Sequence, residues 1–284
     1  YCYTREAALF LLADGMGGHA EGEVAAQLAL QSIAAQFQRE AQPALADPTD
    51  FLQRAVLHAH QHIQRYAKLQ RMPDSPRTTV VALVIQNGAA TWLHCGDSRL
   101  YWVRQGKLLA RTRDHSYLEM ERNASTPIRL AHKLLNRNVL FTCLGATGKP
   151  IVDVNGPHTL HSGDRLLLCS DGLWGALKEP ALLHGLCAQP VNEAIPALVD
   201  SALQIAGPSS DNVTALALEW EMPEHVPSQY DVSTHSASVS ELFASTIQSS
   251  HDLESLDEAL DEEEIERNIA EINAAIRRSA AGKS

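Results

Sequence analysis

The sequence predicts an α+β fold in which antiparallel sheets and helices pack in layers. The first reason is a succession of strand-like runs joined by tight turns between residues 78 and 109, because strands joined by such turns pair antiparallel. The second is the order of elements, since strand-like runs at both ends of residues 1–221 enclose two blocks of helical periodicity. Separate strand and helix blocks favour an α+β sandwich over a doubly wound β–α–β sheet.

The N-terminal part predicts one strand and two helices. Residues 9–13 are all apolar, which is typical of a buried strand, and they run into Asp-Gly-Met-Gly-Gly-His at residues 14–19. Helices are expected over residues 21–38 and 50–69, where apolar side chains recur at helical spacing. Three histidines alternate at positions 58, 60 and 62 in the second helix, so they cannot share one face, and we expect them to be solvated.

The middle of the chain predicts a series of hairpins. Residues 78–85 are rich in β-branched side chains, and Asn87-Gly88 is a strong turn signal before a returning strand at 89–95. Further strands are expected at residues 100–103 and around 108–109. The pattern then loosens, and we interpret residues 114–138 as an irregular insertion with some helix.

The last third predicts the rest of a globular body and then a tail. A strand at residues 165–170, helices at 179–187 and 191–205, and a strand at 213–220 complete the body. The segment from residue 223 to about 250 has the composition of a linker. Isoleucines at 265, 269, 272 and 276 have helical spacing over about two heptads, which favours a partly ordered tail. A helix over residues 252–279 that docks onto a partner or onto the body itself is the alternative hypothesis.

Composition excludes several classes of function. The formal net charge is −11, and most of it lies in residues 222–284, which hold 13 acidic and 4 basic residues. Neither part has the basic excess of a nucleic-acid-binding protein. No apolar run approaches the roughly 20 residues that span a bilayer, so we expect no membrane association. The five dispersed cysteines predict reduced thiols and a cytoplasmic location.

Four carboxylates stand at strand ends or glycine-rich turns: Asp14, Asp97, Asp171 and Asp211. Any one alone would more often be a turn residue. Together they would repel one another unless cations neutralise them. Oxygen ligands favour hard ions, so Mg²⁺ or Mn²⁺ is expected, and two such ions can activate a water molecule for attack on a phosphate.

Six short motifs occur in a fixed order: residues 14–19, Thr78-Thr79, Gly-Asp-Ser-Arg at 96–99, Asp-His-Ser at 114–116, Ser-Asp-Gly at 170–172, and Asp211-Asn212. This order resembles the metal-dependent protein serine/threonine phosphatases of the type 2C (PPM) family in their bacterial form. The resemblance covers about residues 7–220. It implies a four-layer α-β-β-α sandwich of two antiparallel sheets flanked by helices, with a flap insertion after Asp114.

The resemblance also implies the roles of individual residues. Asp14 would bridge two metal ions, and the main-chain carbonyl of Gly15 would complete the coordination of one of them. Asp171 and Asp211 would supply the other carboxylates, and Asp97 with Asp171 would form a third, weaker metal site. The implied reaction is attack by a hydroxide, bound by the two metals, on phosphoserine or phosphothreonine of a protein that a Ser/Thr kinase has modified. Asp14, Asp171 and Asp211 are thus the expected catalytic residues.

Three departures from the family pattern stand out. An Arg-x-x-Asn-Glu/Gln-Asp segment expected before the first strand is absent, so we expect that some natural N-terminal sequence is missing. Met16 occupies a position where some members have a histidine, which leaves the general acid unassigned. Arg77 replaces a glycine before the threonine pair. The absent arginine leaves a second hypothesis open, a non-catalytic regulatory or scaffold protein on the same fold.

A cysteine phosphatase is a further alternative, because Cys95 is followed closely by Arg99. That chemistry needs arginine six positions after the cysteine, where this chain has Tyr101, so the sequence excludes it. We therefore expect a catalytic domain over residues 1–221, with its N-terminal strand segment missing, and an acidic linker and tail helix over residues 222–284.

Overall fold

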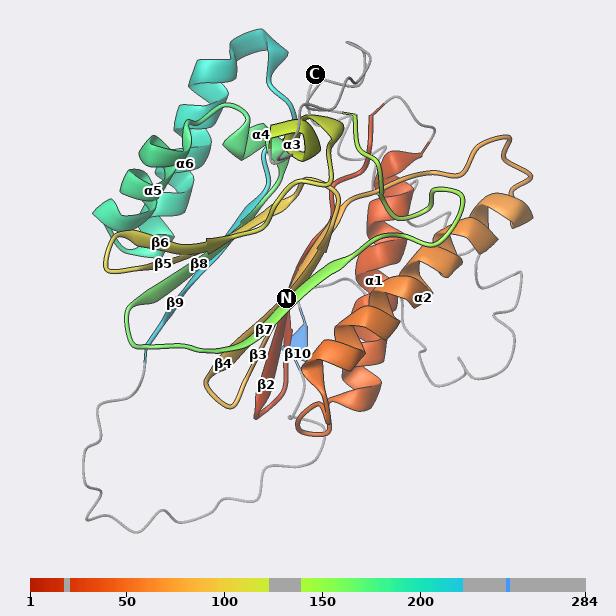
Figure 1. Ribbon diagram of the computed structural model, residues 1–284, viewed down its shortest axis with the longest axis horizontal. Helices are drawn as coiled ribbons and strands as arrows, with labels where there is room; N and C mark the ends of the chain where they lie inside the picture. Colours follow the sequence, from red (N-terminus) through yellow and green to blue (C-terminus); the bar gives the residue numbers. More distant parts are fainter. Residues whose placement is uncertain (18–20, 123–138, 222–243, 246–284) are drawn as a thin grey trace.

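The computed structural model describes residues 1–17, 21–122, 139–221 and 244–245. Two antiparallel sheets pack face to face, and helices cover the outer face of each, giving four layers (Figure 1). The predicted α-β-β-α sandwich is therefore confirmed. Within the described residues, none of the helices combines the length and the apolar character needed to cross a lipid bilayer.

The larger sheet has six strands in the order β10-β1-β2-β3-β4-β7, each antiparallel to its neighbours. Its strands are β1 (Cys2–Tyr3), β2 (Ala7–Leu12), β3 (Val80–Gln86), β4 (Ala89–Cys95), β7 (Asp153–Thr159) and β10 (Ala244–Ser245). The tight turn between β3 and β4 is the predicted one, with both Asn87 and Gly88 at positive φ, as hairpin turns of this kind require.

The smaller sheet has four strands in the order β6-β5-β8-β9, again antiparallel. Its strands are β5 (Arg99–Arg104), β6 (Lys107–Arg111), β8 (Asp164–Cys169) and β9 (Ala215–Trp220). The chain passes from the first sheet to the second between β4 and β5, so the short connection at residues 96–98 lies at the junction of the two sheets.

Helices α1 (Gly22–Glu40) and α2 (Pro48–Leu69) cover the larger sheet, and α5 (Glu179–Ala188) and α6 (Val191–Ala206) cover the smaller one (Figure 1). The Asp47 side chain caps α2 by accepting hydrogen bonds from Thr49 and Asp50, which satisfies two otherwise unpaired amides. Two short helices, α3 (Tyr117–Arg122) and α4 (Asp171–Trp174), and a 3₁₀ turn (Gly207–Ser209) complete the described elements.

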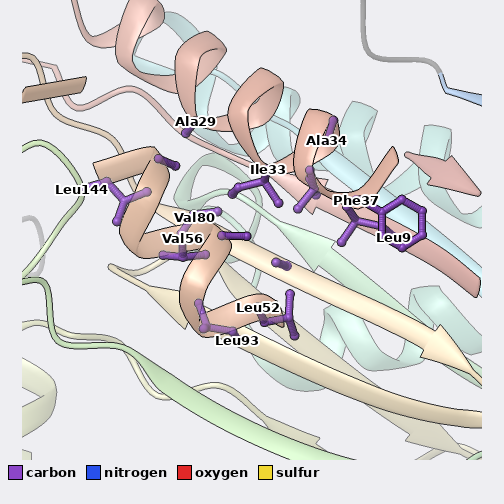
Figure 2. Close-up of a cluster of buried hydrophobic side chains, with 14 of the residues drawn as sticks. Leu9, Ala29, Ile33, Ala34, Phe37, Leu52, Val56, Val80, Leu93 and Leu144 are labelled. Atoms are coloured by element: carbon purple, nitrogen blue, oxygen red, sulfur yellow. The ribbon is translucent and has the colours of Figure 1, made fainter. Parts of the chain in front are cut away.

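The core shows why residues 80–85 are apolar without interruption. Successive side chains of a strand point to opposite faces, and both faces of β3 are covered. Val80, Ala82 and Val84 pack beneath α1 and α2, where Figure 2 shows Ile33, Phe37 and Leu52 among the neighbouring side chains. The alternate residues of β3 pack against the smaller sheet and form the centre of the sandwich; they are Val81, Leu83 and Ile85.

The predicted elements are found with small shifts at their ends, and the structure adds β1, β7 and β10. One expectation was wrong: His60 is buried, at 3% exposure, and its Nδ1 accepts a hydrogen bond from the Gly145 amide. The predicted insertion begins with α3, but its residues 123–138 lie outside the described part of the chain. The predicted tail helix over residues 252–279 also lies outside it.

Candidate metal centre

Asp14 follows β2 in a turn that its main chain fixes. The Asp14 carbonyl oxygen accepts a hydrogen bond of 2.9 Å from the Thr79 amide and one of 2.8 Å from the Thr78 hydroxyl. The next turn residue, Met16, donates its amide to the Arg77 carbonyl oxygen at 2.9 Å. Arg77 and the threonine pair Thr78-Thr79, which directly precede β3, therefore hold the Asp14 turn in one conformation.

Gly15 is required by the close approach of helix α1. A Cβ added at this position would lie 2.4 Å from the carbonyl carbon and oxygen of Gly22, and no real Cβ tolerates such a contact. Gly22 has the matching constraint, because its own Cβ would lie 2.9 Å from the Met16 oxygen. The two glycines let the Asp14 turn and the start of α1 touch backbone to backbone. His19 lies outside the described residues.

Asp171 and Asp211 come from neighbouring segments of the smaller sheet. Asp171 is the first residue of α4, directly after β8, and Asp211 lies in the loop before β9. The Ser170 hydroxyl donates to the Asn212 carbonyl oxygen at 3.1 Å and accepts from the Thr214 amide at 3.0 Å. Ser170 therefore joins the two aspartate-bearing segments.

The Asp211 carboxylate is held by the residue that follows it. The Asn212 amide donates to Asp211 Oδ1 at 2.8 Å. A Cβ added at Gly172 would lie 2.4 Å from the Asn212 oxygen, so the turn after Asp171 packs directly on the loop of Asp211. The orienting contact comes from the Asn212 main chain, which any residue except proline could supply.

Asp97 lies in the connection between the two sheets and is 7% exposed. Gly96 before it adopts a φ of +106°, and an added Cβ would lie 2.7 Å from the Thr79 side chain. The hydroxyl groups of Thr79 and Ser98 are hydrogen-bonded at 2.7 Å. The threonine pair thus fixes both the Asp14 turn and the Asp97 turn.

The electrostatics link the four predicted carboxylates through Asp14 and Asp171. Burial, with the negative charges of Asp171 and Asp211, raises the pKa of Asp14 from 3.8 to about 7. Burial, with the charges of Asp171, Asp114 and Asp14, raises the pKa of Asp97 to about 7 as well. Carboxylates whose ionisation is opposed by neighbouring carboxylates, as at Asp14 and Asp97, fit hard divalent cations, which relieve the repulsion and prefer oxygen ligands.

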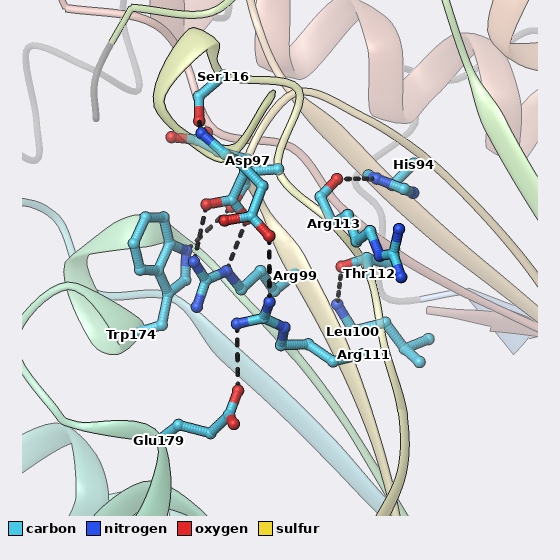
Figure 3. A network of polar contacts seen from close by, with 12 residues as sticks. His94, Asp97, Arg99, Leu100, Arg111, Thr112, Arg113, Ser116, Trp174 and Glu179 are labelled. Atoms are coloured by element: carbon cyan, nitrogen blue, oxygen red, sulfur yellow. Dashed lines mark hydrogen bonds and ion pairs between the residues drawn. The ribbon is translucent and has the colours of Figure 1, made fainter. Parts of the chain in front are cut away.

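A second set of contacts, made by Trp174, Arg99 and Asp114, supports the Asp97 turn (Figure 3). The Trp174 indole N–H donates to the Asp97 carbonyl oxygen at 2.9 Å. The Arg99 guanidinium lies over the Trp174 ring at 3.6 Å and forms two hydrogen bonds of 2.7 Å with the Asp114 carboxylate. Arg99 donates a third hydrogen bond, to the Tyr101 hydroxyl at 3.0 Å, so each of its three guanidinium nitrogens has a partner within the scaffold.

The role of this network was not predicted, although its parts lie in the motifs. Arg99 ends the Gly-Asp-Ser-Arg motif, Asp114 begins the Asp-His-Ser motif, and Trp174 lies three residues after Asp171. The sequence gives one indication of this network, because Arg99 and Asp114 each follow a glycine turn or a strand end. It does not indicate that they pair with each other.

Comparison with known proteins agrees with the fold and the site. The family model described as protein phosphatase 2C matches residues 1–194. A serine/threonine protein phosphatase named PstP from Mycobacterium tuberculosis is 32% identical over 215 residues, which are 75% of this chain and 40% of the relative. A serine/threonine phosphatase named stp from Listeria monocytogenes is 27% identical over 219 residues, covering 76% of this chain and 86% of the relative.

Among solved structures, the catalytic domain of PstP in complex with two manganese ions superposes with a TM-score of 0.61. It is 27% identical, and the match covers 76% of this chain and 95% of that domain. The chain thus spans about 40% of the length of PstP as a whole but nearly all of its catalytic domain.

Proposed function

The chain belongs to the protein phosphatase 2C family, and we propose that it is a metal-dependent phosphatase that hydrolyses phosphoserine and phosphothreonine in proteins. The observation that carries the proposal is the meeting of four carboxylates from separate segments, two of them with a pKa raised to about 7. The names of the relatives, which are serine/threonine phosphatases, support the class of substrate.

We assign the metal ligands by combining the resemblance with this geometry. Asp14 would bind both cations, and the main-chain carbonyl of Gly15 would complete the coordination of one of them. Asp171 and Asp211 would supply carboxylate ligands from the side of the smaller sheet. Asp97 would share a third cation with Asp171. The negative charge of Asp171 is one of the causes that raise the pKa of Asp97. Mn²⁺ and Mg²⁺ both suit these oxygen ligands, and the manganese-bound PstP domain supports Mn²⁺.

When bound, two divalent cations neutralise charge on the phosphate and acidify a water molecule for direct attack. The protein holds the ligands in place beforehand: the threonine pair fixes the Asp14 turn, and Ser170 joins Asp171 to Asp211. Arg99 is committed to Asp114 and Tyr101, so in this arrangement it serves the scaffold and does not anchor the substrate phosphate.

The proposal extends to the rest of the chain. We place the catalytic domain at residues 1–221, because Asp211 and β9, which pairs with β8, lie beyond the matched residues 1–194. Residues 222–284 would form the acidic linker and docking tail. The free cysteines, four of them buried and Cys187 half-buried, support a cytoplasmic location. The substrate would be a protein that a Ser/Thr kinase has phosphorylated.

The test is hydrolysis of p-nitrophenyl phosphate and of a phosphothreonine peptide by the metal-free chain during titration with Mn²⁺ and Mg²⁺. We expect turnover that requires the cation and is lost in Asp14→Asn and in Asp171→Asn. Asp200→Asn is the matched control, because Asp200 is an exposed carboxylate of α6. A chain that binds Mn²⁺ with wild-type stability but turns over neither substrate would favour the non-catalytic scaffold hypothesis.

A further inference from the structure

A second group of potential metal ligands shares no residue with the four carboxylates. His94 is the next-to-last residue of β4, Asp153 is the first residue of β7, and the two are paired across the sheet. His115 follows β6 and stacks on His94 with ring centres 4.5 Å apart. One potential ligand atom from each residue lies within 4.8 Å of the other two. Both histidines are almost fully buried, whereas Asp153 is exposed.

His94 has the hydrogen bonding of a metal ligand. Its Nε2 lies 2.7 Å from the Arg113 carbonyl oxygen, and because a carbonyl only accepts, this nitrogen carries the ring proton. The lone pair is therefore on Nδ1, which is buried and has no hydrogen-bond partner within the described residues. Histidines that bind metals usually donate their other N–H to a carbonyl in this way. Burial lowers the pKa of His94 to about 4, so the ring is neutral at pH 7.

His115 can supply the second nitrogen only if its ring proton moves and its contact with Gly96 is lost. Its Nε2 lies 3.4 Å from Asp153 Oδ2 and is buried. Its Nδ1 accepts a hydrogen bond of 3.2 Å from the Gly96 amide, so without a metal the ring proton is on Nε2. Coordination through Nε2 moves that proton to Nδ1, and the ring must turn away from Gly96. Metal binding here is thereby coupled to the turn that carries Asp97.

The donor set and spacing suit a borderline transition metal ion. Tetrahedral Zn²⁺ with metal–ligand distances of about 2.0–2.1 Å separates its ligand atoms by roughly 3.3 Å. The separation of 3.4 Å between His115 and Asp153 already has this value, and the turn of His115 has only to close the remaining gap. Two imidazoles favour Zn²⁺ over the hard ions that suit an all-carboxylate cluster. The exposed Asp153 leaves a path for the ion from solvent.

We propose that His94, His115 and Asp153 form a second cation site, selective for ions of the Zn²⁺ class and distinct from the four-carboxylate centre. Three protein ligands leave one position open for water, as in zinc sites that are not fully closed. The ion would replace the Gly96 contact of His115, so its occupancy would act on the Asp97 turn.

The experiment titrates the metal-free full chain with Co²⁺, whose visible absorption reports a tetrahedral site, and then displaces it with Zn²⁺. We expect the intense bands of tetrahedral nitrogen and oxygen coordination to saturate at one Co²⁺ per chain, in addition to any Co²⁺ that the four-carboxylate centre binds. Asp153→Asn should weaken Co²⁺ binding at least tenfold and leave the fold unchanged, because this side chain is exposed. Asp171→Asn should leave the signal in place, since it belongs to the other centre.

The matched control is His62→Gln. His58 and His62 form a second close histidine pair among the described residues, with ring centres 6.5 Å apart on helix α2, and such a pair can bind Co²⁺ adventitiously. A tetrahedral signal that survives Asp153→Asn, disappears in His62→Gln, or carries the strong charge-transfer bands of a thiolate would overturn the proposal. Loss in Asp153→Asn alone supports it.

Discussion

The carboxylate cluster should destabilise the metal-free protein as the pH rises. Asp14 ionises near pH 3.8 in the unfolded chain but near 7 in the fold, so the fold holds a proton that the unfolded chain has released. The penalty is absent below about pH 4, grows between pH 4 and 7, and is complete above 7. A shift of about three pKa units corresponds to about 4 kcal/mol, at 1.36 kcal/mol per unit.

Asp14→Asn removes this penalty. Without metal, we expect the variant to be more stable than the wild type by about 2–4 kcal/mol at pH 8, and by less than about 1 kcal/mol at pH 4. The range of about 2–4 kcal/mol allows for the fact that the raised pKa of Asp14 is shared with the carboxylates coupled to it. Urea denaturation in the presence of a chelator, at both pH values, measures the difference.

Mn²⁺ should make the wild type more stable than Asp14→Asn. Saturating Mn²⁺ stabilises the wild type by mass action, whereas Asp14→Asn, which lacks a ligand, should gain little. Asp200→Asn should follow the wild type at both pH values, with and without metal. If metal-free Asp14→Asn is no more stable than the wild type at pH 8, or if its advantage does not depend on pH, the carboxylates are not held together as the structure shows.

Two further predictions concern the scaffold. Arg99→Lys keeps the charge but loses the two-pronged contact with Asp114, so urea denaturation should show a loss of about 1–3 kcal/mol, and unchanged stability would contradict the network. The register of β1 and β10 places Ser245 opposite Cys2, so Ser245→Cys should form a disulfide with Cys2 on oxidation, found by peptide mass spectrometry. Ala244→Cys, opposite Tyr3, should not, and equal cross-linking by both variants would argue against this register.

The sequence predicts the central elements because their local patterns and their burial agree. Both faces of β3 are buried, so an unbroken apolar run and a tight Asn87-Gly88 turn mark the hairpin without ambiguity. β7 shows the opposite case. It is an edge strand whose sequence includes Gly156 and Pro157, residues that usually interrupt strands, and Gly156 is needed because an added Cβ would lie 2.7 Å from the Ala90 oxygen.

The positions of the candidate aspartates in the chain could be recognised from the sequence, but the contacts that support them could not. Asp14, Asp97 and Asp171 follow strands, Asp211 lies in a loop that leads into a strand, and such positions can be recognised from the sequence alone. The contacts behind them join distant segments: Trp174 reaches back to the carbonyl of Asp97, 77 residues earlier. His60 was misjudged for the same reason, because its partner, the amide of Gly145, is 85 residues away. Hydrogen bonds of this range leave no periodic signal.

The position of the four carboxylates gives the cations a structural effect as well as a chemical one. Asp14 follows strand β2 of the larger sheet, Asp171 and Asp211 lie next to strands β8 and β9 of the smaller sheet, and Asp97 lies on the connection between the sheets. Their mutual repulsion therefore acts across the junction of the two sheets, and it is strongest when all four are ionised. Cations bound among them convert that repulsion into attraction. The same ions that would activate water should thus hold the two halves of the sandwich together.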